Sequence, residues 1–589
     1  MNYAYSSRVQ PELQLKLQGW RSRLVLVLVA AGLLALAARA FYLQGMNNSF
    51  LQAKGEARFT RVVDLPASRG AVMDRNGVPL AISTPVESIW ASPGEIDITS
   101  GQVQALARAI NIERSALAEK LKEDGKGFVW LKRQISPEQA AHAMALGIPG
   151  IFQQREYRRY YPQGEVMAHV IGFTGIDDNG QEGIELAQQT WLAGSPGSRR
   201  VLKDRRGRVV EDVESIKAPH EGRNLTLSID QRLQYLAHRE LKAAVEANKA
   251  KGGSAVILDA KTGEVLALVN QPDYNPNNRS AVTGRQTRNR SVTDVFEPGS
   301  TFKPFAVSAA LEAGIVTPRT VFQTGNTFTI AGGTISDSHP AIALTVAEVI
   351  QKSSNIGTAK MALQMPAEKL WNLYTDIGFG AQPGTGFPGE AQGKVRPWKR
   401  WRPIEQATMA YGYGLNVSLL QLARAYTLFT NAGQLVPVTF IKRDGETIGK
   451  QVLSPRTART MAAMLETVVQ AGGTATKGQV SGYRMAGKTG TARKLVNGQY
   501  SEDAHTAVFA GFGPASDPRF IVAVTVDEPA AGKYYAGDVA APVFANIMSG
   551  ALRQYAVPPD APVHELREAA TVPAAPLAGA AGITPAGKG

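Results

Sequence analysis

The stretch FEPGSTFKPFAVSAALEA, residues 296–313, decides how the second half of this chain folds. Its opening residues, Phe296-Glu297-Pro298-Gly299, interrupt regular structure, and the apolar run Thr301–Ala313 then predicts a helix. Ser300 is therefore expected at the helix N-terminus, where free N–H groups favour developing negative charge. Lys303 lies three residues further on, on the same helical face.

Two further short motifs follow this helix in the sequence. Ser353-Ser354-Asn355 begins 53 residues after Ser300, and Lys488-Thr489-Gly490 begins 135 residues after Ser353. Ser-x-x-Lys and Ser-x-Asn each occur once in the chain. Together the three motifs supply a nucleophilic hydroxyl, an amine that could take its proton, a hydroxyl–amide pair and a cation beside hydroxyls. This is the set of groups of a serine acyl-transferase that uses lysine in place of histidine.

Lysine acts as a base only when its pKa, ordinarily about 10.4, is lowered towards neutrality. Burial and a second cation nearby would both lower it, and Lys488 is the candidate for that cation. Thr345-x-x-Glu348 predicts a capping box, so that Ser353 falls where the helix it opens should end. Ser353 could then relay a proton, and Asn355 could hold a substrate amide or Lys303.

Each motif taken alone also fits a purely structural role. Ser300 could simply cap its helix, with Lys303 solvated, and Ser353–Asn355 could be a polar turn between helices. Lys488–Thr491 is predicted in a strand, where a lysine and two hydroxyls suit a carboxylate but also suit an ordinary edge strand. Gly490 would let another segment approach closely.

Two motifs compete with this interpretation. Gly482–Thr489 matches the phosphate-loop pattern, but that loop must open a helix, whereas strand and turn residues follow here. Lys261-Thr262-Gly263 repeats the Lys-Thr-Gly motif between two apolar strands, which predicts a hairpin turn. We therefore reject nucleotide binding and assign the site to the second Lys-Thr-Gly.

Composition excludes several other classes of function. The chain has 589 residues, enough for two or three domains, and no cysteine, which excludes disulfides, thiolate metal sites and cysteine nucleophiles. Its seven histidines show no metal-ligand spacing. A Ser-His-Asp triad stays open as an alternative, although no G-x-S-x-G elbow supports it. The net charge of +14 comes without basic runs interleaved with aromatics, so a solvated basic surface is favoured over nucleic-acid binding. Attraction to an anionic membrane surface or cell-wall polymer fits the charge equally well.

A membrane anchor is predicted over Leu24–Leu43, about 20 residues or about 30 Å of helix. Arg39, near its far end, can extend to the interface. Lys16, Arg21 and Arg23 precede the span, which predicts a cytoplasmic N-terminus. The alternative is a cleaved signal peptide, but no convincing small-x-small site closes the run.

The order of expected elements predicts a mixed α/β domain with an antiparallel sheet. The expected elements are a strand over 225–229, a helix over 231–247 and a hairpin with strands over 254–259 and 264–269. Helical segments are expected from 301 onward, and late strands over 484–495, 505–513 and 520–527. Residues 45–220 look instead like a β-rich module with helical insertions near 102–121 and 137–146.

Four further segments carry a resemblance to a known family. They are Ser68–Gly77, Arg159–Gly164, Gly180–Glu185 and Tyr411–Leu415. With the three motifs above, they resemble class B penicillin-binding proteins of the division-specific peptidoglycan D,D-transpeptidase (FtsI) type. The resemblance covers roughly residues 20–555. It implies a penicillin-binding-protein/serine β-lactamase-like transpeptidase domain and an elongated β-rich pedestal.

The resemblance also implies the reaction and its residues. The implied catalytic residues are Ser300, Lys303, Ser353, Asn355 and Lys488, and those binding substrate are Thr489, Gly490 and Thr491. Ser300 would attack the penultimate D-Ala of a stem pentapeptide, release the terminal D-Ala and pass the acyl group to a neighbouring stem's amine. The N–H groups of Ser300 and Thr491 would form the oxyanion hole. β-Lactams would acylate Ser300, and neither metal nor organic cofactor is implied.

The implied domains are a cytoplasmic tail (1–23), a transmembrane helix (24–43), the pedestal (44–220), the transpeptidase domain (221–556) and a disordered Pro/Ala/Gly-rich tail (557–589). The implied partners are nascent glycan strands, an FtsW-type glycosyltransferase and divisome activators. The implied location is the bacterial inner membrane at the septum, with the catalytic domain periplasmic. Alternatives are an elongation-type transpeptidase or D,D-carboxypeptidase of the same fold, and a non-enzymatic β-lactam sensor or divisome scaffold.

Overall fold

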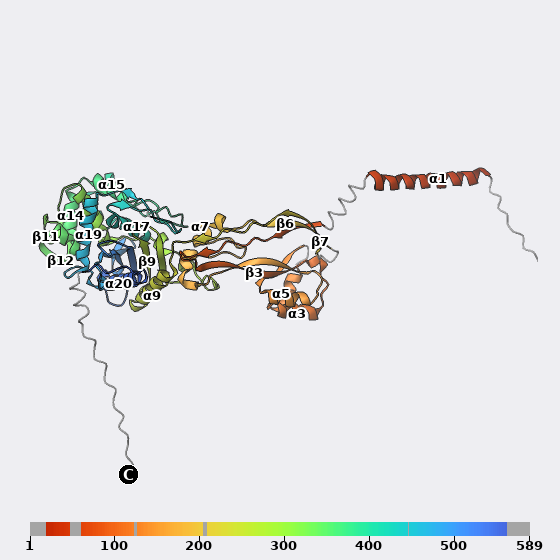
Figure 1. Ribbon diagram of the computed structural model, residues 1–589, viewed down its shortest axis with the longest axis horizontal. Coiled ribbons are helices and arrows are strands. Elements are labelled where there is room, and N and C mark those ends of the chain that lie inside the picture. Colours follow the sequence, from red (N-terminus) through yellow and green to blue (C-terminus); the bar gives the residue numbers. More distant parts are fainter. Residues whose placement is uncertain (1–18, 47–59, 123–126, 204–208, 446, 562–589) are drawn as a thin grey trace, which may run out of the picture. The chain divides into compact units, whose positions relative to one another are not determined.

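The computed structural model describes residues 19–46, 60–122, 127–203, 209–445 and 447–561 (Figure 1). The chain divides into two compact units. Unit 1 comprises Met1–Pro66, Glu87–Gln154 and Pro196–His220, and unit 2 comprises Ala67–Val86, Arg155–Ser195 and Glu221–Gly589. Segments of the predicted pedestal therefore occur in both units.

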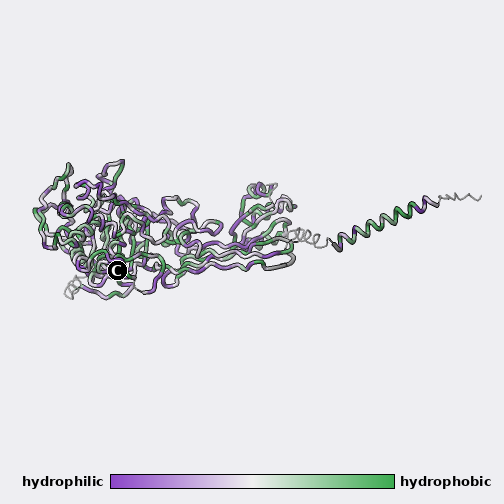
Figure 2. Tube along the Cα trace, turned by 90° about the horizontal axis from the view of Figure 1, so that it is seen from above, coloured by the Kyte–Doolittle hydropathy of each residue, from purple (hydrophilic) through white to green (hydrophobic). Residues whose placement is uncertain are grey.

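The first described element of unit 1 is the helix α1, Gly19–Phe41, which continues as a π-helical turn over Tyr42–Met46. Its 23 residues span about 35 Å, enough to cross a bilayer. None of its side chains is buried, and Figure 2 shows it as a predominantly hydrophobic segment. The predicted apolar helix over Leu24–Leu43 is confirmed, and α1 begins five residues earlier, within the predicted tail (1–23), of which residues 1–18 lie outside the described part of the chain.

The rest of unit 1 is built from strands and short helices. One antiparallel sheet joins β1 (Thr60–Leu65), β6 (Gly197–Lys203) and β7 (Val209–Lys217). A separate core packs α3 (Ser100–Ala109), α4 (Arg114–Leu121) and α5 (Pro137–Ala145) with β4 (Val129–Ile135). The helix expected over 102–121 is thus two helices, because Asn111 adopts a positive φ of 50° just after α3.

Two long strands supply residues to both units. β3 (Pro79–Ala91) pairs with β2 (Val72–Met73) through residues of unit 2 and with β4 through residues of unit 1. β5 (Ile151–Tyr160) also pairs with β3, and β2 pairs in parallel with β8 (Leu225–Thr226). The β-rich character predicted for this part of the chain is confirmed.

A five-stranded antiparallel sheet forms the centre of unit 2. Its order is β10-β9-β17-β16-β15. The bounds are β9 (Gly252–Asp259), β10 (Val265–Gln271), β15 (Ala486–Val496), β16 (Gln499–Gly513) and β17 (Phe520–Asp527). The side chains of β9 and β10 are buried throughout, as expected for strands covered on both faces. β15 is an edge strand, which leaves its outer side free to meet the nucleophile.

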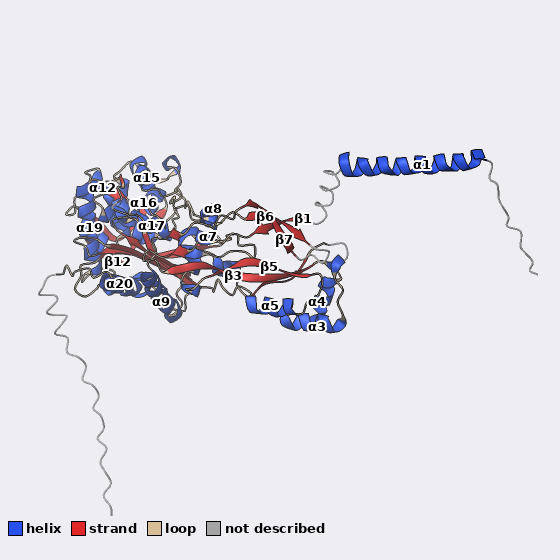
Figure 3. Ribbon diagram, turned by 45° about the vertical axis from the view of Figure 1, so that its right-hand side comes forward, coloured by secondary structure: helices blue, strands red, loops and turns tan. Residues whose placement is uncertain are grey.

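Helices cover both faces of this sheet (Figure 3). α9 (Gln231–Ala247) and α20 (Ala536–Gln554) lie together on one face, and α9 buries Leu233, Leu236, Ala237 and Leu241 at helical spacing. α17 (Leu419–Ala425) packs on the other face. The remaining helices include α12 (Lys303–Glu312), α13 (Val346–Gln351), α14 (Asn355–Leu363), α15 (Ala367–Asp376), α16 (Pro403–Ala410), α18 (Thr427–Thr430) and α19 (Pro455–Val469).

A separate two-stranded hairpin, β11 (Val321–Ile330) and β12 (Gly333–Thr345), precedes α13. This hairpin was not among the elements predicted from the sequence. Short strands β13 (Gln434–Leu435) and β14 (Lys450–Gln451) pair elsewhere. Of the predicted tail from residue 557, the structure describes 557–561, where Asp560 accepts hydrogen bonds from the Arg484 N–H and the Ser516 hydroxyl, both at 2.7 Å.

Candidate active site

Ser300 lies in a tight turn immediately before α12. Gly299–Phe302 form a 3₁₀ turn, and Gly299 has a positive φ of 53°. The Gly299 N–H donates to the Gly412 carbonyl at 3.1 Å. This contact requires glycine at Gly412, because its φ is +88° and a Cβ there would lie 2.1 Å from the Gly299 oxygen. The segment containing Gly412 therefore fixes the turn that presents the nucleophile.

Aromatic side chains pack against the same turn. Phe302 is fully buried, and its ring centroid lies 4.7 Å from that of Tyr374 and 4.8 Å from that of Phe379. The Tyr426 hydroxyl donates to the Thr301 carbonyl at 3.1 Å. A rigid support of this kind keeps the positions of Ser300 and Lys303 constant.

Lys303 is completely buried at the start of α12. Its Nζ donates to the Ser353 carbonyl at 2.5 Å and to the Ser353 Oγ at 3.1 Å. Burial lowers the pKa of Lys303 to about 7, against the opposing effect of the Asp337 carboxylate, so the neutral amine is well populated at neutral pH. A neutral amine has two hydrogens and one lone pair, and Lys303 donates both hydrogens to Ser353. The lone pair remains to accept a proton.

Ser353 and Asn355 flank the junction of α13 and α14. Ser353 has a positive φ of 63°, and the capping box at Thr345 and Glu348 that opens α13 is present as predicted. The Asn355 Nδ2 donates to the Ser336 carbonyl at 2.9 Å. Among the described residues, Lys303 has no hydrogen bond to Asn355, so Ser353 alone links this motif to the lysine.

Asp337, on β12, is a site residue that the sequence analysis missed. Its carboxylate accepts from the Ser354 hydroxyl and the Asn355 N–H, both at 2.5 Å, and from the Ile356 N–H at 3.0 Å. An acid at the first turn of α14 is favoured by the free N–H groups there. Only the fold of the β11–β12 hairpin brings Asp337 to α14, since no local pattern connects residues 337 and 354.

We predict that Asp337→Asn shifts the pH profile of acylation of Ser300 towards lower pH. The Asp337 charge raises the pKa of Lys303, so its removal lowers that pKa, and the midpoint should fall below 7. Weaker capping of α14 should also cost about 1 kcal/mol of stability. Asp517→Asn, at a surface carboxylate 78% exposed, is the control. A midpoint that moves upward would contradict this role.

Lys488 lies in the middle of β15 and is also completely buried. Its Nζ donates to the Thr489 carbonyl at 3.3 Å. Its pKa is lowered well below the ordinary value, first by burial and then by the charge of Lys303. The expectation that Lys488 lowers the pKa of Lys303 is not supported, because the pKa of Lys303 is lowered by its burial.

The rest of the Lys-Thr-Gly motif lies against the turn of Ser300. A Cβ on Gly490 would come within 2.7 Å of the Pro298 carbonyl, which explains the need for glycine at this contact. The Thr489 hydroxyl pairs with the Thr474 hydroxyl at 2.7 Å, and the Thr491 hydroxyl accepts from the Ala536 N–H at 3.0 Å. The structure thus brings the three motifs into one place.

The structure supports neither of the two competing interpretations of the sequence motifs. Lys488 and Thr489 are inside a strand rather than before a helix, which excludes the phosphate-loop interpretation. Lys261-Thr262-Gly263 forms the turn between β9 and β10, as predicted. Within the part of the chain that the structure describes, no group of three His, Asp or Glu side chains is placed to hold a metal ion.

Gly412→Ala should weaken the presentation of Ser300. We expect a loss of about 2 kcal/mol of stability, because the new Cβ combines a positive φ with a clash against the Gly299 carbonyl, and slower acylation by penicillin. Gly445→Ala separates the two effects, since Gly445 has a similar φ of +87° but no atom within 4 Å of the added Cβ. Equal acylation rates in both variants would exclude a role for the Gly412 contact.

Comparison with known proteins gives consistent matches over most of the chain. Residues 64–227 match the penicillin-binding protein dimerisation domain, and residues 253–549 match the penicillin-binding protein transpeptidase domain. The chain is 45% identical over 92% of its length to a probable peptidoglycan D,D-transpeptidase PenA of Neisseria meningitidis, covering 94% of that protein. It is 44% identical over 92% of its length to the peptidoglycan D,D-transpeptidase FtsI of Escherichia coli, covering 93% of it.

Solved structures agree with these matches. A transpeptidase domain of Burkholderia pseudomallei penicillin-binding protein 3 is 50% identical, covers 57% of this chain and 98% of its own, and gives a TM-score of 0.53. A peptidoglycan synthetase from Bifidobacterium adolescentis covers 85% of this chain and 98% of its own, with 26% identity and a TM-score of 0.69. The chain therefore belongs to the penicillin-binding proteins that combine a dimerisation domain with a transpeptidase domain.

Proposed function

We propose that this chain is a serine peptidoglycan D,D-transpeptidase that cross-links stem peptides during septal wall synthesis. The observation that carries the proposal is the state of Lys303: a buried amine with a pKa of about 7, three residues from Ser300, with both hydrogens donated to Ser353. No other arrangement among the described motifs supplies a nucleophile together with a base.

In the first step, the Ser300 Oγ attacks the carbonyl of the penultimate D-Ala while the neutral Lys303 amine accepts its proton. The tetrahedral oxyanion receives hydrogen bonds from the N–H groups of Ser300 and Thr491, each worth about 10²–10³ in rate. The C–N bond then breaks, and the leaving D-Ala amine takes the proton, with Ser353 as the relay. Ser300 is left as an ester.

In the second step, the amine of a neighbouring stem attacks the ester carbonyl. Lys303, again neutral, accepts the proton of the attacking amine, and the Ser300 oxygen regains a proton as it leaves. Asn355, which follows Ser353, is proposed to hold the substrate amide through its side-chain oxygen, since its Nδ2 already donates to Ser336.

The terminal carboxylate of the donor stem is proposed to bind at Lys488, Thr489 and Thr491, beside Gly490. The Thr491 hydroxyl accepts from Ala536 N–H, so its own hydrogen is free to donate to an anion. A carboxylate close to Lys488 would raise the lysine's pKa and so favour its charged form, against the effect of burial. Binding of substrate would therefore pair Lys488 with the carboxylate while Lys303 stays available as the base.

We further propose that α1 anchors the chain in the inner membrane, with the basic N-terminus cytoplasmic and the catalytic unit periplasmic. Arg21 and Arg23 near the start of α1 support this orientation. Nascent glycan strands, an FtsW-type glycosyltransferase and divisome activators are the proposed partners, and the predicted domain limits (44–220, 221–556 and 557–589) remain part of this proposal. A fluorescent fusion should concentrate at the septum; uniform labelling of the side wall would favour an elongation role.

The reaction is tested by supplying the purified full chain with uncross-linked glycan strands that carry pentapeptide stems. We expect dimeric muropeptides to form in equal number with released D-Ala. D-Ala without dimers would instead identify a carboxypeptidase. If neither product forms while penicillin still labels Ser300, the chain is a sensor or scaffold.

A further inference from the structure

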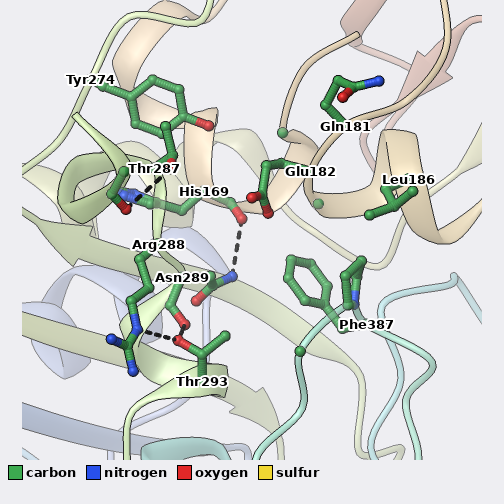
Figure 4. A pocket seen from close by; sticks show the side chains of 15 residues that line it. His169, Gln181, Glu182, Leu186, Tyr274, Thr287, Arg288, Asn289, Thr293 and Phe387 are labelled. Carbon is green, nitrogen blue, oxygen red and sulfur yellow. Dashed lines mark hydrogen bonds between the residues drawn. The ribbon is translucent and has the colours of Figure 1, made fainter. Parts of the chain in front are cut away.

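A pocket lies in unit 2, and none of the proposed active-site residues lines it. Its volume is about 550 Å³, within the range of small-ligand sites. Figure 4 shows its walls: His169 and Glu182 from the segment around α6 (Ala168–Ile171) and α7 (Gly183–Ala187), Tyr274 and Asn289, and Phe387 from a glycine-rich loop. The floor is buried, while Leu186 and Arg288 at the rim are exposed.

The polar groups of the floor are already paired within the protein. The His169 ring shares a hydrogen bond of 2.7 Å with the Gln286 carbonyl, and the Tyr274 hydroxyl donates to the Ala168 carbonyl at 3.0 Å. Asn289 donates to the His169 carbonyl at 3.0 Å. Burial lowers the pKa of His169 to about 4, so its ring is neutral at pH 7 and does not repel a cation.

Two charged side chains line the pocket, and only one of them has a partner among the described residues. Arg288 forms an ion pair with Asp294 at 2.6 Å. The Glu182 carboxyl group has no hydrogen bond or ion pair within the described part of the chain, and burial raises its pKa. In Figure 4 its carboxylate faces the space between His169 and Phe387. The pocket thus presents one carboxyl group without a partner in the described structure, beside aromatic rings.

The complement of such a surface is a compact cation. A carboxylate binds an ammonium through charge-assisted hydrogen bonds, and the rings of Tyr274 and Phe387 can add cation–π attraction. We propose that this pocket is a second, non-catalytic binding site for a primary ammonium group, carried by the diamino acid of a peptidoglycan stem peptide. The choice of stem peptide rests on the proposed function, since the acceptor stems of that reaction carry such an amine. Occupation would keep the protein on amine-bearing strands between catalytic events.

The test uses the full chain with Ser300 acylated by penicillin, so that the active site is covered. The probe is the tripeptide N-acetyl-L-Ala-γ-D-Glu-meso-diaminopimelate, whose one free amine is that of the diamino acid, and calorimetry or NMR measures its binding. We expect Glu182→Gln to weaken binding by about tenfold or more. Acetylation of the side-chain amine of the peptide should have the same effect. Glu368→Gln, at an exposed carboxylate of α15, is the matched control and should bind as the unmodified chain does.

Each other outcome would overturn the proposal. Binding that is insensitive to Glu182→Gln or to acetylation would exclude the ammonium–carboxylate contact. Tighter binding of a lysine-rich peptide than of the tripeptide would assign the pocket to a partner protein instead. An unchanged melting temperature and an unchanged rate of penicillin labelling before acylation establish that Glu182→Gln is folded. Failure of labelling at Ser300 is a separate measurement and bears on the proposed function alone.

Discussion

Replacing Ser300 with alanine is expected to abolish covalent labelling of the purified chain by a fluorescent penicillin. In the proposed reaction a penicillin acylates the hydroxyl that otherwise attacks the D-Ala carbonyl, and the variant has no oxygen at this position. Ser300 is partly exposed in the turn before α12, so loss of its hydroxyl leaves no buried cavity. Gel fluorescence after denaturation measures the covalent product.

Ser280→Ala is the matched control, because Ser280 is an exposed serine of the same unit with no part in the three motifs. Its labelling should equal that of the unmodified chain. Undiminished labelling of Ser300→Ala would contradict the proposal that Ser300 is the nucleophile. An unchanged melting temperature of the variant would rule out unfolding as the cause of lost labelling.

Replacing Lys303 is expected to have the second largest effect, a fall of about 10²–10⁴ in the rate of acylation of Ser300. Only the unprotonated amine can accept the serine proton. The rate of the unmodified chain should therefore rise with pH through about 7, where Lys303 loses its proton, and then level off. In Lys303→Arg the guanidinium stays protonated at every accessible pH, so this rise should disappear.

Stopped-time labelling between pH 5.5 and 9, as a series of roughly half-unit steps, gives the profile. Lys303→Met is the second variant, since it keeps the volume of the buried chain without any charge. Lys261→Arg is the control, because Lys261 belongs to the other Lys-Thr-Gly motif and lies in a surface turn with its side chain 40% exposed. A rise that persists in Lys303→Arg, or a rate of the unmodified chain that does not level off by about pH 9, would contradict the role of Lys303 as the base.

Periodicity predicted the regular elements of unit 2 well. The helix over 231–247 and the strand over 520–527 have the predicted bounds, and the hairpin of β9 and β10 extends the predicted one by two residues at the start of β9 and at the end of β10. These elements have continuous apolar faces, so local pattern and burial agree. The helix expected over 301–313 begins at Lys303 instead, because the positive φ of Gly299 produces a 3₁₀ turn first.

Elements that depend on distant contacts were predicted less well. The β11–β12 hairpin carries exposed apolar residues such as Ile342, 84% exposed, and shows no simple alternation, so its pattern gave no strand signal. With the hairpin unpredicted, Asp337 could not be placed. The division of the region before residue 220 between two compact units likewise depends on pairing across long stretches of chain.

By itself, the sequence determined the chemical groups of the candidate site: Ser300, Lys303, the Ser353–Asn355 motif and the strand that contains Lys488. Their order and uniqueness, together with a helix starting near Ser300, were sufficient to predict acyl transfer. Only the tertiary structure decided how the pKa of Lys303 is lowered. Its pKa falls because surrounding side chains exclude water from the amine, and Asp337, brought in by a distant hairpin, limits that fall. Burial and long-range charge depend on which segments meet in space, and no local pattern contains that information.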